Sequence, residues 1–310
     1  MKRAKERFKS TPIVFAVLKA IRNRLDEFTP RHRAFAEYVM QHPESLAFFS
    51  ITDIAKDSGV SQTTIVRFCN VLGYNGYAQL VRETRRTIQS EIGSAGRFKI
   101  VRQMRKDLKK PQTLSAFERL LNQELENLTN LFKSIKSADF YHCIDVMMKA
   151  DQICIIGCMS SASLALFFGD ILSKTFSGVN VLHDHGVNAP AVFQQLSKKS
   201  LVFLISFPPY AKTTVELGRF AVGKKAYIVA ITDNNNSPIV PLADIVFLIP
   251  VNMQSYMESY SAPMALISVL VNALAERHPE KTEKVLLQYD EYSSQMNLYK
   301  VSRERIKYKR

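Results

Sequence analysis

Residues 51–72, which read ITDIAKDSGVSQTTIVRFCNVL, constrain the fold of this 310-residue chain more than any other segment. Their apolar side chains recur at the spacing of two short helices that cross steeply through a tight turn, and these are Ile54, Val60, Ile65 and Phe68. Ala55 is small enough to let the second helix approach, Gly59 can take the positive φ of the turn, and Ser61 can cap the helix that follows. The segment therefore predicts a helix-turn-helix.

The second of these helices is expected to present a polar face to its surroundings. That face carries short hydroxyl and amide side chains with one guanidinium, namely Ser61, Gln62, Thr63, Thr64 and Arg67. Side chains of these types near a helix N-terminus suit base edges and phosphates in a major groove. We therefore expect these five residues to contact a double-stranded DNA operator. An ordinary helical hairpin with a polar outer face is the alternative.

The distribution of charge favours the DNA-binding interpretation. Residues 1–110 hold 22 of the 42 basic residues but only 10 of the 28 acidic ones, whereas residues 111–310 are nearly balanced. A basic module joined to a nearly neutral one is typical of a DNA-binding domain attached to another domain. A basic membrane-surface segment is less consistent, because the basic residues alternate with a globular apolar pattern.

Composition indicates a cytoplasmic protein with reduced thiols. No apolar run approaches the roughly 18–20 residues that a membrane-spanning helix requires, so no membrane partner is expected. The four cysteines lack a CxxC pair, and Cys154 and Cys158, which flank a predicted strand end, are expected to act as small buried hydrophobic residues. We expect no metal, no cofactor and no catalytic residue.

The chain divides into four predicted segments: a helix-turn-helix DNA-binding domain over 1–92, a basic linker over 93–112, a ligand-binding domain over 113–297 and a basic tail over 298–310. In the first, Thr29-Pro30 is a natural start for a helix, and Leu72-Gly73-Tyr74 is a natural stop. A further helix is predicted from Tyr77 to Ile92. The ligand-binding domain begins with an amphipathic helix through Leu114–Phe132, which is long enough that we expect part of its apolar stripe to lie between subunits.

Five short apolar runs in the second half of the chain predict strands, namely QICIIG, NVLHD, LVFLIS, AYIVAIT and DIVFLIP. They are continuous rather than alternating, which is typical of strands buried on both faces of a parallel sheet. Helical stretches separate them, and two more helices follow through Ala262–Ala275 and Lys281–Met296. The predicted fold class is α/β with two domains: an all-α helix-turn-helix domain, then a five-stranded parallel sheet with helices on both faces.

Ligands of such sheets bind beyond the carboxyl ends of the strands. Three loops at these ends are rich in hydroxyl and amide groups, and they lie at residues 157–161, 206–214 and 232–238. Two of them open a helix, whose free N–H groups can bind an anion. We expect a small anionic ligand with many hydroxyls, contacted by Ser160, Ser161, Ser206, Lys212 and Thr214. Plain helix capping by these Ser and Thr residues is the alternative.

The order of elements and several motifs resemble the RpiR (MurR/RpiR) family of bacterial transcription regulators over roughly residues 13–290. The resemblance rests on SITDIAKDSGVSQTTIVRFCNVLGYNGYAQL in the first half, and on ADQICIIGCMSSA and TDNNNSPIVPLAD in the second. It implies a SIS (sugar isomerase) domain that senses a phosphosugar or a related metabolite, modulates operator binding and assembles as a homodimer or homotetramer.

Two departures from the family pattern concern the ligand. Met159 stands where the second glycine of the first loop is usual, and Ala211-Lys212 stands where Ser-Gly is expected in the loop 206–214. One phosphate-binding hydroxyl is therefore lost. Either Lys212 supplies a charge in its place, or the ligand is not a phosphosugar.

A sugar-phosphate isomerase of SIS type with an accessory domain is the main alternative function. Isomerisation needs a positioned base, for which the candidates are His183, His185, Glu216 and Glu258. No acid/base pair stands out among them in the sequence, and the two histidines lack an evident third metal ligand. A nucleoid-type DNA binder would leave the ligand-type domain without a purpose. A ligand-responsive transcription regulator is therefore the favoured interpretation.

Overall fold

The computed structural model describes residues 15–43, 45–48, 50–81, 83–84, 98, 115–249 and 259–298. Two compact units are present, and the division between them falls within one helix, between Gln123 and Glu124. The two units are taken in turn below.

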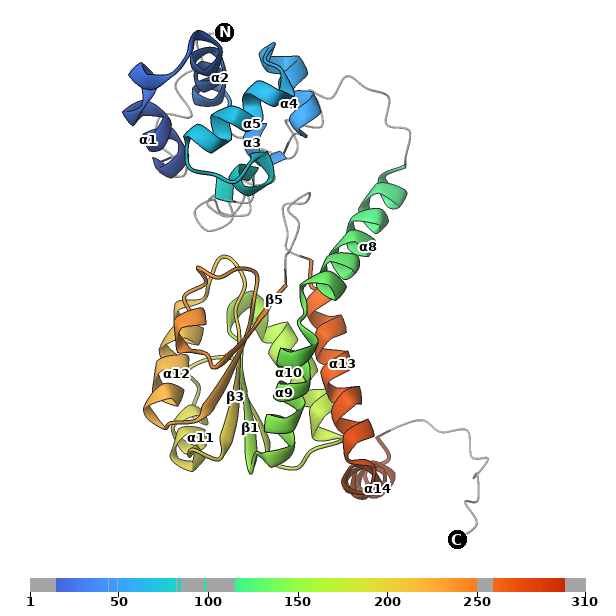
Figure 1. Ribbon diagram of the computed structural model, residues 1–310. Helices are drawn as coiled ribbons and strands as arrows, with labels where there is room; N and C mark the ends of the chain where they lie inside the picture. Colours follow the sequence, from blue (N-terminus) through green and yellow to red (C-terminus); the bar gives the residue numbers. More distant parts are fainter. Residues whose placement is uncertain are drawn as a thin grey trace. The chain divides into compact units, whose positions relative to one another are not determined.

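The first unit is helical, with the order α1 (Phe15–Asn23), η3 (Leu25–Glu27), α2 (Pro30–Gln41), α3 (Ser45–Phe48), α4 (Ile51–Ser58) and α5 (Gln62–Val71) (Figure 1). Helix α2 begins as predicted, because the Thr29 side chain accepts the His32 N–H at 3.3 Å and Pro30 is the first helical residue. Residues 77–81 and 83–84 are also helical, and the rest of the helix predicted to Ile92 lies outside the described residues.

The predicted helix-turn-helix is confirmed as α4 and α5. Gly59 ends α4 with φ 69°, and the Ser61 side chain caps α5. Ile54, Ile65 and Phe68 are fully buried in the core of this unit. The ring of Phe68 lies 5.0 Å from that of Phe35 on α2, at 90°. Helices α2, α4 and α5 therefore share one core, which fixes the outward face of α5.

The second unit contains the predicted five-stranded parallel sheet. Its strands are β1 (Gln152–Ile156), β2 (Val179–Leu182), β3 (Ser200–Ile205), β4 (Tyr227–Thr232) and β5 (Ile245–Leu248). All neighbouring pairs are parallel, and the strand order is β2-β1-β3-β4-β5. The order reverses between β1 and β3, so this is the point at which a ligand crevice is expected.

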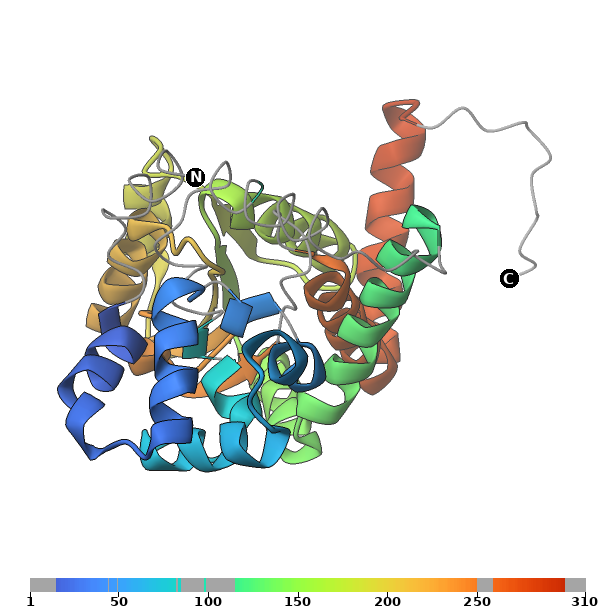
Figure 2. The same cartoon turned by 90° about the horizontal axis from the view of Figure 1, so that it is seen from above.

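Helices cover both faces of the sheet, as predicted (Figures 1 and 2). One face packs against α11 (Ala189–Gln195) and α12 (Lys212–Gly223) through alternate strand residues such as Cys154 and Val202. The other face packs against α9 (Ser137–Lys149) and α10 (Ala162–Ser173), and α13 (Ser261–Arg277) packs against these two helices. The rings of Phe168 on α10 and Phe203 on β3 lie 4.7 Å apart there. Burial of each strand on two faces explains the continuous apolar runs.

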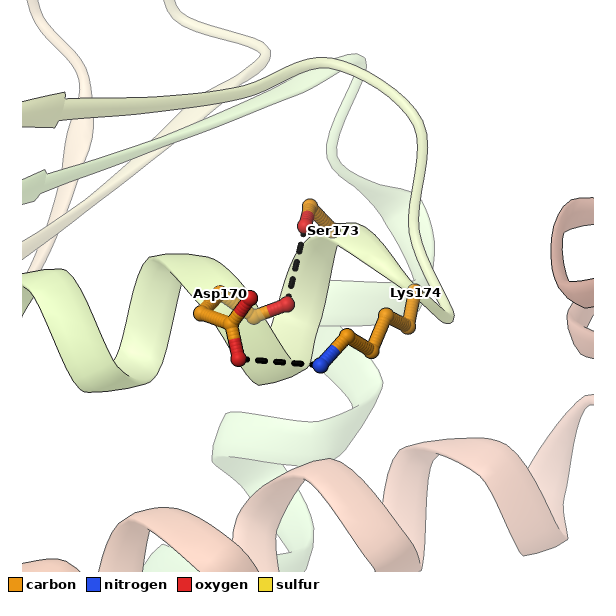
Figure 3. Close-up of polar contacts among 3 residues, drawn as sticks. All are labelled: Asp170, Ser173 and Lys174. Atoms are coloured by element: carbon orange, nitrogen blue, oxygen red, sulfur yellow. Dashed lines mark hydrogen bonds and ion pairs between the residues drawn. The ribbon is translucent and has the colours of Figure 1, made fainter. Parts of the chain in front are cut away.

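The last described helix, α14 (Pro279–Gln295), packs against α13 and contacts the residue that follows α10. Figure 3 shows Lys174 reaching back to the Asp170 carboxylate at 2.9 Å, while the Ser173 hydroxyl donates to the Asp170 carbonyl at 2.9 Å. The same Lys174 ammonium lies 5.6 Å from the centroid of the Tyr289 ring on α14. The Lys174 ammonium thus makes both an ion pair with Asp170 and a cation–π contact with Tyr289.

All four cysteines are free and buried, which confirms the buried position predicted for Cys154 and Cys158. Burial raises the pKa of Cys69 and of Cys154 to about 12 and raises those of Cys143 and Cys158 as well, so none of the four is an activated thiolate. Among the residues that the structure describes, no helix is both long enough and apolar enough to span a bilayer.

Candidate functional sites

The five residues predicted to contact DNA lie on α5 and its N-cap, and three of them form contacts that build the start of the helix. The Ser61 hydroxyl accepts the Thr64 N–H at 3.3 Å, and the two side-chain oxygens lie 2.9 Å apart. Gln62 donates its amide to the Thr52 hydroxyl at 3.2 Å, which ties the start of α5 to α4. These contacts position the helix before any partner binds.

The side chains of Thr63 and Arg67 remain exposed and make no hydrogen bond with another described residue. They lie on one face of α5, since they are one helical turn apart. Val66, which sequence reasoning missed, shares that face and is 37% exposed. Asn70 lies there too, but its side-chain oxygen accepts the Gly76 N–H at 3.2 Å. Helical spacing from Thr63 is the signal that would have found Val66.

The loop after β1 begins with Gly157, where a Cβ would lie 2.8 Å from the Ser161 carbonyl oxygen. Met159, the residue that departs from the glycine pattern, has φ 55° and an exposed side chain. The backbone thus keeps a left-handed conformation that glycine favours. Ser160 is exposed and Ser161 is buried, so only the first of these predicted ligand contacts is freely accessible.

The loops after β1 and β3 meet where the strand order reverses. The buried Thr214 hydroxyl accepts the Cys158 N–H at 3.1 Å, and this bond joins the first loop to the first turn of α12. Ser206 at the end of β3 is 1% exposed, and its hydroxyl has no hydrogen-bond partner in the part of the chain that the structure describes. A buried, unsatisfied hydroxyl is costly, so Ser206 is the predicted ligand residue with the clearest need for an additional partner.

Lys212 opens α12 and is already paired. Its ammonium lies 3.4 Å from one carboxylate oxygen of Glu216, and the other oxygen lies 3.3 Å from His185 Nε2 after β2. The hydrogen bond with Lys212 is the main cause that lowers the pKa of Glu216 below its ordinary value. Two of the acid/base candidates, His185 and Glu216, are therefore neighbours. The sequence does not reveal this contact, because His185 follows β2 whereas Glu216 lies in α12, 31 positions later.

The third predicted loop is bound to the second by a polar network. The Tyr210 hydroxyl donates to the Asp233 carboxylate at 2.7 Å and accepts from the Asn234 amide at 2.8 Å. Thr232 donates to the Ser206 carbonyl at 2.7 Å. Burial raises the pKa of Asp233, and hydrogen bonds from Tyr210 and Asn234 oppose that rise. The loops that follow β3 and β4 therefore form one ordered rim.

The carboxyl ends of the strands thus lie close to the hydroxyls of Ser160 and Ser206, to the N-termini of α10 and α12, and to the ion-paired ammonium of Lys212. Such a set suits an anionic ligand with several hydroxyls. The described residues include no group of three or more His, Cys, Asp or Glu side chains placed to hold a metal ion.

Comparisons with known proteins assign both units. Residues 15–91 match the family described as "Helix-turn-helix domain, rpiR family", and residues 147–273 match the SIS domain. The regulator HexR of Pseudomonas aeruginosa is 29% identical over 150 residues, which cover 48% of this chain and half of HexR. An uncharacterized HTH-type transcriptional regulator of Thermotoga maritima is 25% identical over 278 residues, covering 87% of this chain and 95% of that protein.

Solved structures show the same fold. The NanR protein of Vibrio vulnificus, complexed with ManNAc-6P, is 19% identical with a TM-score of 0.56, and the match covers 92% of this chain and 100% of that one. The sugar isomerase domain of an RpiR transcription factor from Sphaerobacter thermophilus is 22% identical with a TM-score of 0.54, covering 57% and 99%. With an rpiR-type helix-turn-helix domain followed by a SIS domain, the chain belongs to the RpiR family of transcriptional regulators.

Proposed function

We propose that this protein is a DNA-binding transcriptional regulator whose SIS domain binds a phosphosugar or a related anionic metabolite and thereby changes its affinity for an operator. The observation that carries the proposal is the joining, in one chain, of an rpiR-type helix-turn-helix domain to a SIS domain. The helix-turn-helix domain has a polar face that can contact DNA, and the SIS domain has strand-end loops that can bind an anion.

On the DNA side, α5 is the recognition helix. Thr63, Val66 and Arg67 form its outward face, while Ser61, Gln62 and Thr64 hold its first turn. Arg67 can donate to a guanine edge or a phosphate, and the methyl groups of Val66 and Thr63 can contact a thymine methyl. We therefore reassign Ser61 and Thr64 from direct base contact to positioning of the helix.

On the effector side, the anion binds where the loops after β1 and β3 meet. The Ser206 hydroxyl gains the partner that it lacks, and Ser160 contributes an accessible hydroxyl. The anionic group competes with Glu216 for the Lys212 ammonium. NanR of Vibrio vulnificus was solved with ManNAc-6P, which makes phosphosugars the first class to screen.

Operator recognition by a single α5 would cover only a few base pairs. Two-fold dimers solve this by placing two recognition helices in successive major grooves. The active form in this proposal is therefore a homodimer or a homotetramer.

A second candidate function, sugar-phosphate isomerisation, is favoured by the His185–Glu216 contact at 3.3 Å. The relatives named as transcriptional regulators favour a role without catalysis. In an aldose–ketose assay with the phosphosugar that binds best, we expect no turnover. If the wild-type protein does convert the compound, and Glu216→Gln abolishes this activity, the protein is an isomerase instead.

Two measurements test the main proposal. A selection from a random duplex library should enrich one sequence family with wild-type protein, and Arg67→Ala should lose that enrichment. A thermal-shift screen of phosphosugars, including ManNAc-6P, should raise the melting temperature of wild type for at least one compound, since a bound ligand stabilises by mass action. Absence of any enriched sequence would refute the regulator.

A further inference from the structure

Helix α8 (Ala116–Ser134) exposes most of its large apolar side chains along one stripe, and Leu120, which is also exposed, lies beside that stripe. The exposed fractions of the side chains in the stripe lie between 37% and 86%, and the residues are Phe117, Leu121, Leu125, Leu128 and Phe132. Their spacing of four, four, three and four residues keeps them on one face of a helix. At 1.5 Å of rise per residue, the stripe is about 22 Å long.

Another face of the same helix is buried and partly polar. It includes the amide side chains of Gln123 and Asn127 together with Leu131. A helix at the surface of a monomer is expected to bury its apolar face and expose its polar one. Here the larger apolar face is the exposed one, and contiguous apolar patches of this kind mark interaction surfaces.

The stripe is complementary to itself when reversed. Read in either direction it presents Phe, three Leu and Phe, so an antiparallel copy places Phe117 against Phe132 of the second copy and Leu121 against its Leu128. Leu125, near the midpoint, then meets its own equivalent. A two-fold interface requires this kind of self-complementarity.

Charge along α8 selects the same orientation. The first part of the helix, residues 116–126, contains Glu118, Glu124 and Glu126 against the single basic Arg119, whereas the second part, residues 127–134, contains Lys133 and no acidic residue. Antiparallel pairing brings the acidic end of each helix to the basic end of the other. Parallel pairing would bring like ends together.

We propose that α8 packs antiparallel against α8 of a second copy of this chain, across a two-fold axis near Leu125. This inference rests on the homo-oligomer of the proposed function and identifies its interface.

Cysteine cross-linking tests the orientation, because the four native cysteines are buried. Under mild oxidation, Leu125→Cys should give a covalent dimer in high yield. Glu126→Cys, an exposed neighbour outside the stripe, is the matched control and should stay largely uncross-linked. Phe117→Cys alone should cross-link poorly, whereas an equimolar mixture of Phe117→Cys and Phe132→Cys should give the mixed dimer. Efficient cross-linking of Phe117→Cys alone would establish parallel pairing and overturn the proposal.

Sedimentation gives a second measurement that does not depend on thiol chemistry. Wild-type protein at micromolar concentration should sediment as a dimer or larger, and Leu125→Asp should shift it toward smaller species with its circular dichroism spectrum unchanged. A wild-type monomer, or a Leu125→Asp variant that assembles like wild type, would contradict the interface. Enrichment of a DNA sequence by the same wild-type sample reports the regulator function separately, so the two ideas can fail independently.

Discussion

Arg67 is the only cationic residue of α5, and its exposed side chain shares the outward face with Thr63 and Val66. The neighbouring hydroxyls of Ser61 and Thr64 are already engaged with each other. A single exposed guanidinium on a rigidly capped helix is well placed to read a base or to fix the register on a phosphate.

We predict that Arg67→Ala weakens binding to the selected duplex by about 1–3 kcal/mol, the usual value of a good bidentate base contact. Fluorescence anisotropy titrations measure the change. Lys224→Ala, which removes one exposed positive charge from the second unit, is the control and should bind like wild type. Equal affinities of Arg67→Ala and wild type, with folding intact, would mean that α5 is not the recognition helix.

Asp233 should make stability depend on pH. Burial raises its folded-state pKa above the ordinary value of 3.8. Its contribution to stability is therefore complete below the unfolded-state pKa and declines as the pH rises through the folded-state pKa. Asp233→Asn lacks this titration, so the difference in unfolding free energy between wild type and variant should change with pH from about pH 4 upward. Urea titrations across this interval measure it, and a difference that is constant with pH would argue against the shift.

At the scale of elements, the turn between α4 and α5 sets the angle between these two helices. Gly59 has φ 69°, and nothing lies within 4 Å of the position that a Cβ would occupy there. The cost of a side chain at this position is therefore backbone strain rather than a clash.

Gly59→Ala should lower the unfolding free energy of the first unit by about 1 kcal/mol, because alanine disfavours positive φ. Gly223→Ala is the control, and it should change the unfolding free energy in the opposite direction. Its added Cβ also meets nothing within 4 Å, but the φ of Gly223 is not in the left-handed region. There, the reduced entropy of the unfolded chain should stabilise by about 0.4–1 kcal/mol. Urea titrations of both variants measure this, and a stabilising Gly59→Ala would exclude the proposed role of the turn.

The strand-end loops should couple effector binding to DNA binding. We predict that Ser160→Ala combined with Ser206→Ala leaves operator affinity unchanged without effector and abolishes the effect of the phosphosugar. Ser173→Ala, whose hydroxyl contacts only the α10 carbonyl of Asp170 in Figure 3, should respond like wild type. Operator titrations with and without the compound measure this. A double variant that responds at wild-type concentrations would place the effector elsewhere.

At the scale of the whole molecule, periodicity and capping residues were sufficient to predict the main elements. Thr29-Pro30, Gly59 and the five apolar runs act locally, so the sequence shows them directly. The strand order β2-β1-β3-β4-β5 depends on crossover connections between distant segments and was not predicted. The same holds for the contact of His185 with Glu216, 31 positions apart in the chain. The cap by Ser61 was predicted, but the engagement of the Thr64 hydroxyl with it was not, because exposed and engaged hydroxyls look alike in a sequence.

The central prediction is that one protein reads DNA through α5 and senses a metabolite through the SIS domain. A ligand shifts DNA affinity only as far as it prefers one arrangement of the oligomer over another, typically by 5–150-fold.

The most direct test is an anisotropy titration of the selected duplex and a scrambled duplex, with and without the stabilising phosphosugar. We expect tight binding to the selected duplex only, and an affinity that changes at least about fivefold when the compound is present. Equal affinity for both duplexes, unaffected by any compound that stabilises the protein, would contradict a ligand-responsive transcriptional regulator.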